Sequence, residues 1–595
     1  MMKNFLHGEI ELCRDLPIPE SEIDLVQMAK DALNYLVQNP RKELNYECRF
    51  GIDLMREKLW PADDEHEVIT VGDTDLRMLI EYPYMKEMTA SDEADETAIG
   101  LMNRCIGYLD ENFGCTVTSG CWNGADQPYT APWATGKLLI ALCDKYRATK
   151  DESLRTVCRR MFESICKHSV KENDMICYPN GNGVYHTDGT IAISNETPYS
   201  PSMHPEAITV YAETFQDEEA MQFAYALAKG EVNRLMKKYW VLNDLSLLDD
   251  QQKDEFSRMA DNDTVYTLPE HSDFIILVRD DGSFDHHSHF RGHTVWGVAH
   301  IAYLTKDKEL IAWCKKVLDF YLYRGTDFGW IPESMTFPRR SETCAVADVI
   351  SIALYMAKCG YTEYYDTVER FIRNYISKAQ FFVTDEYKKL YLTRHPGEAG
   401  IRGLKEAKRI EGGFLGAVGI NDRLFNDENM DMMGCCAPEG MRSTYFAWKH
   451  VVYREENTVS VNLNFTADTP DAKVVSLQPE SGGVRVHAKT AGNYQIRLAS
   501  WAEKEQVCAL KNGNTVSVTI TDKGYVLIDD VKSGDCIEVS YPIKSFKQTV
   551  SVKSEEGKQD RNLTVYWRGS TVIDVLPRGK YLPFYRCEGI ESYEF

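Results

Sequence analysis

The chain has 595 residues, which is too many for one ordinary hydrophobic core, so we expect two or three domains. Its composition, 43% hydrophobic and 27% charged, is that of a soluble globular protein. The net charge of −24 leaves no basic stripe to displace counterions, which argues against a nucleic-acid partner.

No membrane or secretion segment is visible in the sequence. The N-terminus, MMKNFLHGEIELCRDL, lacks an apolar core, and no later stretch approaches the roughly eighteen apolar residues of a membrane span. The 17 cysteines are odd in number and scattered, which does not fit a disulfide framework. We therefore expect a cytoplasmic protein with no membrane partner, and we leave open whether it forms a homodimer.

Residues 21–445 have a mainly helical pattern with a weak internal repeat. Residues 149–161 (TKDESLRTVCRRM) and 305–317 (TKDKELIAWCKKV) both follow an apolar helix and begin with Thr-Lys-Asp, whose aspartate can cap the next helix. Repeated helical hairpins predict either an open solenoid or a closed toroid. Long polar and aromatic inserts, such as 177–206 and 277–293, favour a toroid whose loops build a pocket on one face.

From residue 446 to 595 the sequence pattern becomes typical of β-strands. Apolar and polar residues alternate with a period of two, for example in NTVSVTITDKGYVLIDDV and GDCIEVSYPI, and glycine-rich turns separate the runs. This pattern predicts an antiparallel β-sandwich after the helical domain. Residues 1–20 are expected to form an N-terminal arm that joins the sandwich.

Four residues in two short motifs form the strongest candidate site. SETCAVAD contributes Glu342 and Cys344, and MGCCAPEG contributes Cys435 and Cys436. Three thiolates and one carboxylate supply the four ligands of a closed tetrahedral zinc site, and thiolates favour zinc over magnesium or calcium. Zinc also holds its cysteines as thiolates, so the site can store a nucleophile. From the residues alone a structural zinc is the alternative, because closed Cys-rich sites are usually structural.

The sequence resembles glycoside hydrolase family 127, whose founding activity is β-L-arabinofuranosidase. The resemblance runs from RGHTVWGVAHIAYL through GWIPESMTFPRRSETCAVADVISIALYMAKCG to GCCAPEGMRS, and continues in the C-terminal NYQIRLASWAEK. It implies an (α/α)₆ barrel followed by a β-sandwich. It also implies that one zinc ion is held by Glu342, Cys344, Cys435 and Cys436.

The resemblance further implies the catalytic and sugar-binding residues. Cys435 would attack the anomeric carbon, while Glu333, in the PESM segment, would protonate the leaving oxygen and then activate water, so that configuration is retained. The sugar pocket would use His293, Glu369 and Tyr391. The polar inserts add further histidines, among them His204, as candidate pocket residues.

The segment beside the expected acid/base, Glu333, differs from the sequence that is usual in the family. The segment after Glu333 reads SMTFPRRS, with Arg339 and Arg340 where the family has an acidic run, and Lys137 stands where family members commonly have histidine. One hypothesis is that the arginines select a sugar that carries a carboxylate, since arginine binds carboxylates bidentately. The alternative is that they are solvated loop residues.

The sequence therefore predicts a retaining exo-glycoside hydrolase that acts on β-L-arabinofuranoside-like, or related acidic, sugar residues of plant glycan fragments. A non-catalytic carbohydrate-binding or scaffold protein with a structural zinc is the alternative from another class. A different reaction on the same barrel, such as sugar epimerisation or lyase chemistry, is a weaker third option.

Overall fold

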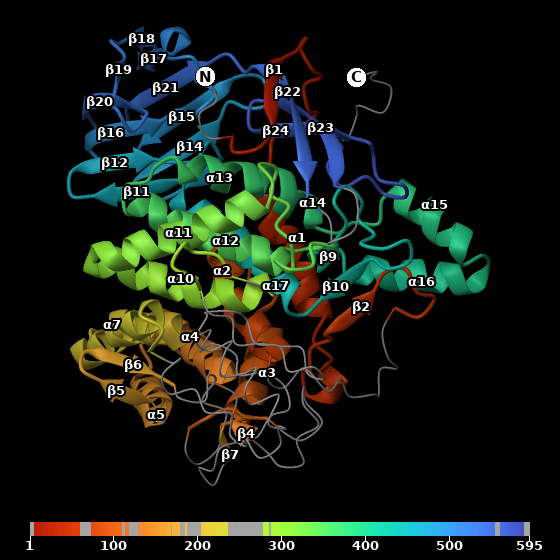
Figure 1. Cartoon of the computed structure of the whole chain (residues 1–595), viewed down its shortest axis with the longest axis vertical. Coiled ribbons are helices and arrows are strands. Elements are labelled where there is room, and N and C mark those ends of the chain that lie inside the picture. The colour runs from red at the N-terminus through yellow and green to blue at the C-terminus, as the bar shows by residue number, and fades with distance from the viewer. Residues whose placement is uncertain are drawn as a thin grey trace.

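The computed structural model describes residues 5–59, 73–109, 113–117, 129–130, 132–167, 169–178, 185–186, 204–235, 278–284, 287–553 and 560–587. Helices fill the N-terminal three quarters of the chain, and strands fill most of the rest (Figure 1). No helix in this described part is both long and apolar enough to cross a bilayer.

Six helices form a closed inner ring within the described residues. Each packs against the next along the chain, and the last packs against the first. They are α2 (Asp75–Thr89), α4 (Pro132–Thr149), α6 (His204–Phe215), α10 (Ser288–Thr305), α12 (Thr343–Lys358) and α17 (Cys436–His450). Closure of this ring excludes the open solenoid.

A second set of helices packs outside the ring, each against an inner partner. They are α1 (Leu25–Gln38), α3 (Asp95–Ile106), α5 (Glu152–Lys167), α7 (Glu218–Val232), α11 (Lys308–Arg324) and α13 (Tyr364–Phe371). The domain is thus an (α/α)₆ toroid, as predicted. Because the chain alternates between the two rings, all inner helices run in the same direction and their N-terminal ends share one face.

The sequence explains which helix lies in which ring. Inner helix α12 reads TCAVADVISIALYMAK and is buried on nearly all sides, as a helix that is apolar all round should be. Outer helix α5 buries only one face, which consists of Leu154, Cys158, Met161, Phe162 and Ile165. The aspartate cap predicted from the repeat is present at α11, where Asp307 accepts hydrogen bonds from the backbone N–H groups of Glu309 and Leu310.

Shorter elements complete the helical domain. A protruding hairpin of α15 (Asp385–Arg394) and α16 (Glu398–Arg409) follows a π-helical turn at Ile372–Ile376 and α14 (Ser377–Ala379) (Figure 1). Other short pieces of this domain are a 3₁₀ turn at Lys42–Leu44 and the strands β3 (Thr116–Val117), β4 (Tyr129–Thr130), β5 (Val170–Glu172), β6 (Met175–Cys177) and β7 (Tyr185–His186), and a second 3₁₀ turn, Lys504–Gln506, lies in the C-terminal region.

The C-terminal region contains two facing sheets of the predicted sandwich. One has the order β11-β12-β16-β20-β19 and the other β13-β14-β15-β21-β17-β18. Their strands are β11 (Val452–Glu455), β12 (Thr458–Val461), β13 (Ala467–Asp468), β14 (Ala472–Ser476), β15 (Gly482–Ala488), β16 (Gly492–Arg497), β17 (Cys508–Lys511), β18 (Asn514–Thr515), β19 (Thr519–Ile520), β20 (Tyr525–Val531) and β21 (Cys536–Tyr541). One pairing differs from the antiparallel prediction: β12 and β16 are parallel, because the chain visits the other sheet between them.

A third sheet joins the two ends of the chain. Its order is β1-β22-β23-β24, from β1 (Glu9–Leu12), β22 (Ser545–Val552), β23 (Arg561–Arg568) and β24 (Thr571–Leu576). Strand β1 pairs antiparallel with β22, and Phe5 packs edge-on against Phe546 and Trp567. The N-terminal segment therefore lies against the C-terminal strands (Figure 1).

Two inner helices, α10 and α12, approach closely at a glycine. A Cβ added at Gly292 would lie 2.6 Å from the Cβ of Asp348. In an ordinary helix, replacing glycine by alanine stabilises the protein by about 0.5–1 kcal/mol. Here we expect Gly292→Ala to lower the free energy of unfolding by about 1–3 kcal/mol, because the helices must separate. Denaturant unfolding measures this, and a rise in stability would contradict the close packing.

Candidate active site

The four predicted metal ligands lie together at the N-terminal face of the ring. Sγ of Cys436 is 3.3 Å from Sγ of Cys344, although the two residues are 92 positions apart. Sγ of Cys344 is 3.4 Å from Oε2 of Glu342, and Sγ of Cys435 is 3.6 Å from Sγ of Cys436. Glu342, Cys344 and Cys436 are buried, whereas Cys435 is partly exposed. We call these four residues (Glu342, Cys344, Cys435 and Cys436) the thiol cluster.

Short strands hold each half of the thiol cluster in place. Strand β8 (Ser341–Glu342) pairs with β9 (Ala417–Val418), and α12 begins directly after it, so Glu342 and Cys344 start that helix. Strand β10 (Asp431–Met433) pairs with β2 (Gly51–Asp53) just before α17. Cys435 stands at the N-cap position of α17. Both cysteine segments therefore meet the positive end of a helix, which favours thiolate.

The environment distinguishes Cys435 from its two neighbours. Hydrogen bonds from the Cys344 and Cys436 thiols, helped by the Arg77 guanidinium, hold the pKa of Cys435 well below its usual range. Burial raises the pKa values of Cys344 and Cys436. Two sulfurs and a carboxylate oxygen, from Cys344, Cys436 and Glu342, lie close enough together to hold a metal ion. Sγ of Cys435 adjoins this group through Cys436. Cys435 is the member that both ionises and meets solvent.

A charged cluster lies beside the thiols and contains the predicted acid/base. Arg340 donates through Nε and Nη2 to the two carboxylate oxygens of Glu333, with Nη2 at 2.6 Å from Oε1. Nε2 of His287 is 3.1 Å from Oε2 of Glu342. Burial and the neighbouring Glu342 raise the pKa of Glu333, although Arg340 and His287 oppose that rise. The three residues His287, Glu333 and Glu342 therefore form one connected set.

His287 was one of the insert histidines that the sequence offered as pocket candidates, but the sequence assigned it no role. It lies in DHHSH, a run more typical of a flexible loop, and no metal spacing singled it out. In the structure it is the N-cap of α10 and accepts a hydrogen bond from the backbone N–H of Phe290. Burial disfavours its charged form, but the adjacent Glu342 carboxylate outweighs burial and raises its pKa. Its position just before an apolar helix was the signal available in the sequence.

A buried polar layer lies beneath the thiols and includes the predicted His293. Nε2 of His293 is 3.3 Å from Glu439 Oε1 and 3.5 Å from Asp348 Oδ1. His289 bonds Asp348 at 2.7 Å through Nδ1, while Arg77 donates to its Nε2 at 2.9 Å. His289, His293 and Asp348 have a spacing that could hold a metal. Arg77, beside His289, instead supplies positive charge that balances the buried carboxylates of this layer.

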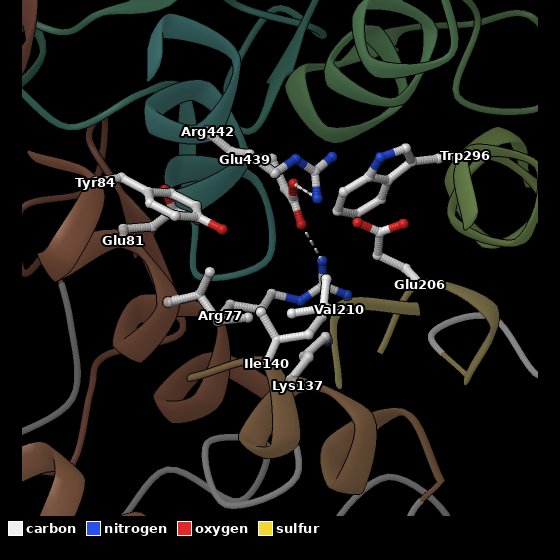
Figure 2. Close-up of a pocket in the computed structure, with 11 residues that line it drawn as sticks. Arg77, Glu81, Tyr84, Lys137, Ile140, Glu206, Val210, Trp296, Glu439 and Arg442 are labelled. Carbon is white, nitrogen blue, oxygen red and sulfur yellow. Dashed lines mark hydrogen bonds and ion pairs between the residues drawn. The ribbon is translucent and has the colours of Figure 1, made fainter. Parts of the chain in front are cut away.

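Below this layer the ring holds a small cavity of about 30 Å³ (Figure 2). In Figure 2 the side chains of Arg77 and Glu439 meet at its centre, and Arg442 joins Glu439 from the same helix. Lys137 donates to Asp73 at 2.6 Å, and burial together with Arg77 lowers its pKa to about 8. The lining residues are Arg77, Ile80, Glu81, Tyr84, Lys137, Ile140, Glu206, Val210, Trp296, Glu439 and Arg442.

Three predicted pocket residues contact other parts of the molecule. Glu369 is buried where the toroid meets the sandwich, and its carboxylate is bound by Arg373 at 3.2 Å and Arg497 at 3.1 Å. Tyr391, on α15, is buried and donates to the backbone carbonyl of Arg56. His204 is the first residue of α6, and its ring packs on Tyr178. Glu369 and Tyr391 thus join separate parts of the chain, whereas His204 starts an inner helix on the same face of the ring as the thiol cluster.

The comparisons with solved structures agree with the resemblance at the level of the fold. A GH127 β-L-arabinofuranosidase from Geobacillus stearothermophilus T6 is 13% identical, with 95% of this chain and 86% of that chain covered and a TM-score of 0.59. A second GH127 β-arabinofuranosidase is also 13% identical, with 96% and 85% covered and a TM-score of 0.56. The chain therefore has the fold of the GH127 enzymes.

The sequence comparisons identify no relative. No protein-family model matches the chain, and no curated protein matches it. The likeness to solved structures covers at least 95% of this chain in both comparisons, so it includes the toroid and the sandwich. The fold is shared, while the identity of the sugar must be argued from the side chains of this protein.

The position of Glu369 predicts that it stabilises the domain contact. We expect Glu369→Gln to lower the free energy of unfolding by about 3 kcal/mol or more, because two buried arginines lose their common partner. Glu363→Gln, at an exposed position nearby in the chain, should change it by less than about 0.5 kcal/mol. Denaturant unfolding of both variants tests this. Equal stability of the two variants would contradict this structural role and favour the predicted role of Glu369 in the sugar pocket.

Proposed function

We propose that this protein is a retaining exo-glycoside hydrolase that uses Cys435 as nucleophile and Glu333 as acid/base. The observation that carries the proposal is the convergence of Glu342, Cys344 and Cys436, with Cys435 beside Cys436 and Glu333 near Glu342, at one end of a GH127-like toroid. The names of the two structural neighbours favour β-L-arabinofuranoside residues as substrates. Plant glycan fragments are the source we propose for such residues.

Glu342, Cys344, Cys435 and Cys436 would hold the metal, which we propose to be zinc. Four ligands with three sulfurs suit that ion, and neighbouring ligand atoms of the cluster lie 3.3–3.6 Å apart. When bound, zinc would keep the thiols ionised and make the sulfur of Cys435 a better leaving group in the second step. The residues present therefore fit the ion.

The chain's own residues would perform both chemical steps. In the first, Sγ of Cys435 forms a bond to the anomeric carbon as the glycosidic C–O bond breaks, and Glu333 gives its proton to the departing oxygen. In the second, the Glu333 carboxylate takes a proton from water, whose oxygen displaces the sulfur with retained configuration. The raised pKa of Glu333 supports the first role, because the acid must be protonated before it can donate.

A non-catalytic carbohydrate-binding protein with a structural metal is the second candidate. The burial of Glu342, Cys344 and Cys436 favours it, since closed sites are usually structural. The partial exposure of Cys435 distinguishes the two candidates, because a nucleophile must reach its substrate whereas a structural ligand need not.

Removing either catalytic group should abolish turnover and leave the fold intact. We expect Cys435→Ser to lower kcat/KM by about 10²–10⁴-fold for 4-nitrophenyl β-L-arabinofuranoside, measured as release of nitrophenol. Glu333→Gln should cause a loss of similar size on the methyl glycoside, whose leaving oxygen needs the proton. Cys508→Ser, at an exposed position in the sandwich, is the control. A pentosyl adduct on the Cys435 peptide, seen by mass spectrometry after rapid quenching, would identify the nucleophile. Full activity of folded Cys435→Ser protein would refute the mechanism.

Metal content provides a test that is independent of activity. We expect the purified protein to hold about one zinc per chain, and Cys436→Ser to lose most of it, because three-ligand sites bind more weakly. Cys314→Ser changes a cysteine that is equally buried but lies on outer helix α11, so its zinc content should not change. Elemental analysis of dialysed protein measures both. Equal metal content in the two variants would place the ion elsewhere.

A further inference from the structure

The strongest side-chain contact of the acid/base is with Arg340. The two residues face each other across a short hairpin, where the backbone N–H of Glu333 donates to the carbonyl of Arg340 at 2.8 Å. Their side chains add a second link, the bidentate pair between the guanidinium and the carboxylate. A backbone bond and a two-point side-chain bond therefore join the same two residues.

Arg340 is itself held in position. Its guanidinium lies 4.9 Å from the ring centre of Phe425, and its Nη2 is 3.9 Å from Oε1 of Glu342. Burial weakens screening by water, so these contacts act more strongly than they would on an open surface. Phe425, Arg340 and Glu333 thus form a chain of contacts that ends at the acid/base carboxylate.

This arrangement decides between the two roles considered for Arg340, which were binding an acidic sugar and lying solvated in a loop. A sugar carboxylate would need the fork of Nε and Nη2, but Glu333 already occupies both nitrogens. Such an anion would also approach Glu333 and Glu342, whose negative charges would repel it. Arg340 is therefore neither a solvated loop residue nor a free binding group for an acidic sugar.

We propose that Arg340 is the positioning residue of the acid/base, which rests on the function proposed above. Glu333 lies in a loop, and its backbone is fixed by Arg340 and by Ser288, whose N–H donates to the Glu333 carbonyl at 2.7 Å. Its side chain has several rotatable bonds, and the guanidinium fork limits them to one orientation. The fork also binds the carboxylate that forms when Glu333 gives its proton to the leaving oxygen.

The proposal has a kinetic signature that a general structural role would not produce. Protonation by Glu333 matters most when the leaving group is a poor one, because a nitrophenolate departs without help. Misplacing Glu333 should therefore slow cleavage of alkyl glycosides far more than cleavage of aryl glycosides. Loss of general stability would lower both rates together.

The experiment compares methyl and 4-nitrophenyl β-L-arabinofuranosides in four proteins: wild type, Arg340→Gln, Arg340→Lys and Arg339→Gln. We expect Arg340→Gln to lower kcat/KM on the methyl glycoside by about 30-fold or more, and on the nitrophenyl glycoside by less than about 3-fold. We compare kcat/KM because it reports the first step, whereas the second step also uses Glu333 and is common to both substrates. Arg340→Lys should recover only part of the loss, since lysine keeps the charge but not the fork. Arg339→Gln removes the same charge one residue away and should match wild type.

Several outcomes would overturn the inference. An equal fall on both substrates, an unchanged rate, complete recovery in Arg340→Lys or a similar loss in Arg339→Gln would each contradict positioning by the fork. If Arg340→Gln does not fold, Arg340→Lys carries the same leaving-group comparison. A wild-type protein that cleaves neither glycoside would count against the proposed function, whereas a wild type that cleaves both, with an even loss in the variant, would count against Arg340 alone.

Discussion

Helix α12 packs against α17 with the first residues of the two helices side by side, and the candidate site depends on this contact. Each helix contributes its N-terminal end, where the helix dipole is positive. Thiolates and a carboxylate are therefore placed where negative charge is stabilised. The α17 helix also packs against α2, so the contact that carries the site is part of the closed ring.

The polar layer beneath the thiols has a different origin. Inner helices of a ring face one another across a narrow axis, and here they carry Arg77, Asp348, Glu439 and Arg442 as well as histidines. Burying such charges is unfavourable unless each meets a partner, and the observed ion pairs provide those partners. The layer connects α2, α10, α12 and α17 directly, so it fixes the orientation of the helices that carry the cysteines.

The sequence was most informative where a local pattern determines the structure. Period-two alternation and helical hairpins predicted the two domains' architecture, and the rare combination of Glu-x-Cys with Cys-Cys predicted the thiol cluster. Pairings between distant side chains were beyond local reasoning. The fork of Arg340 on Glu333 depends on a hairpin register, and the place of Glu369 depends on Arg497 from a strand of the sandwich. The local sequence around Glu333 and around Glu369 does not show which arginine each carboxylate binds.

The histidines illustrate the same limit. His287 and His289 are two residues apart, yet one caps α10 beside Glu342 and the other points into the buried layer toward Asp348. A helix that starts between them turns successive side chains in different directions. Without the start of that helix, neither position can be assigned to a site.

Strand β1 has a consequence for how the chain acquires its structure. Its partner β22 is synthesised more than five hundred residues later, since Glu9 pairs with Thr549. During translation β1 therefore has no partner strand while the toroid assembles, and its backbone groups bond to water. The third sheet then gains its edge strand last, when β1 pairs with β22 in a late step of assembly.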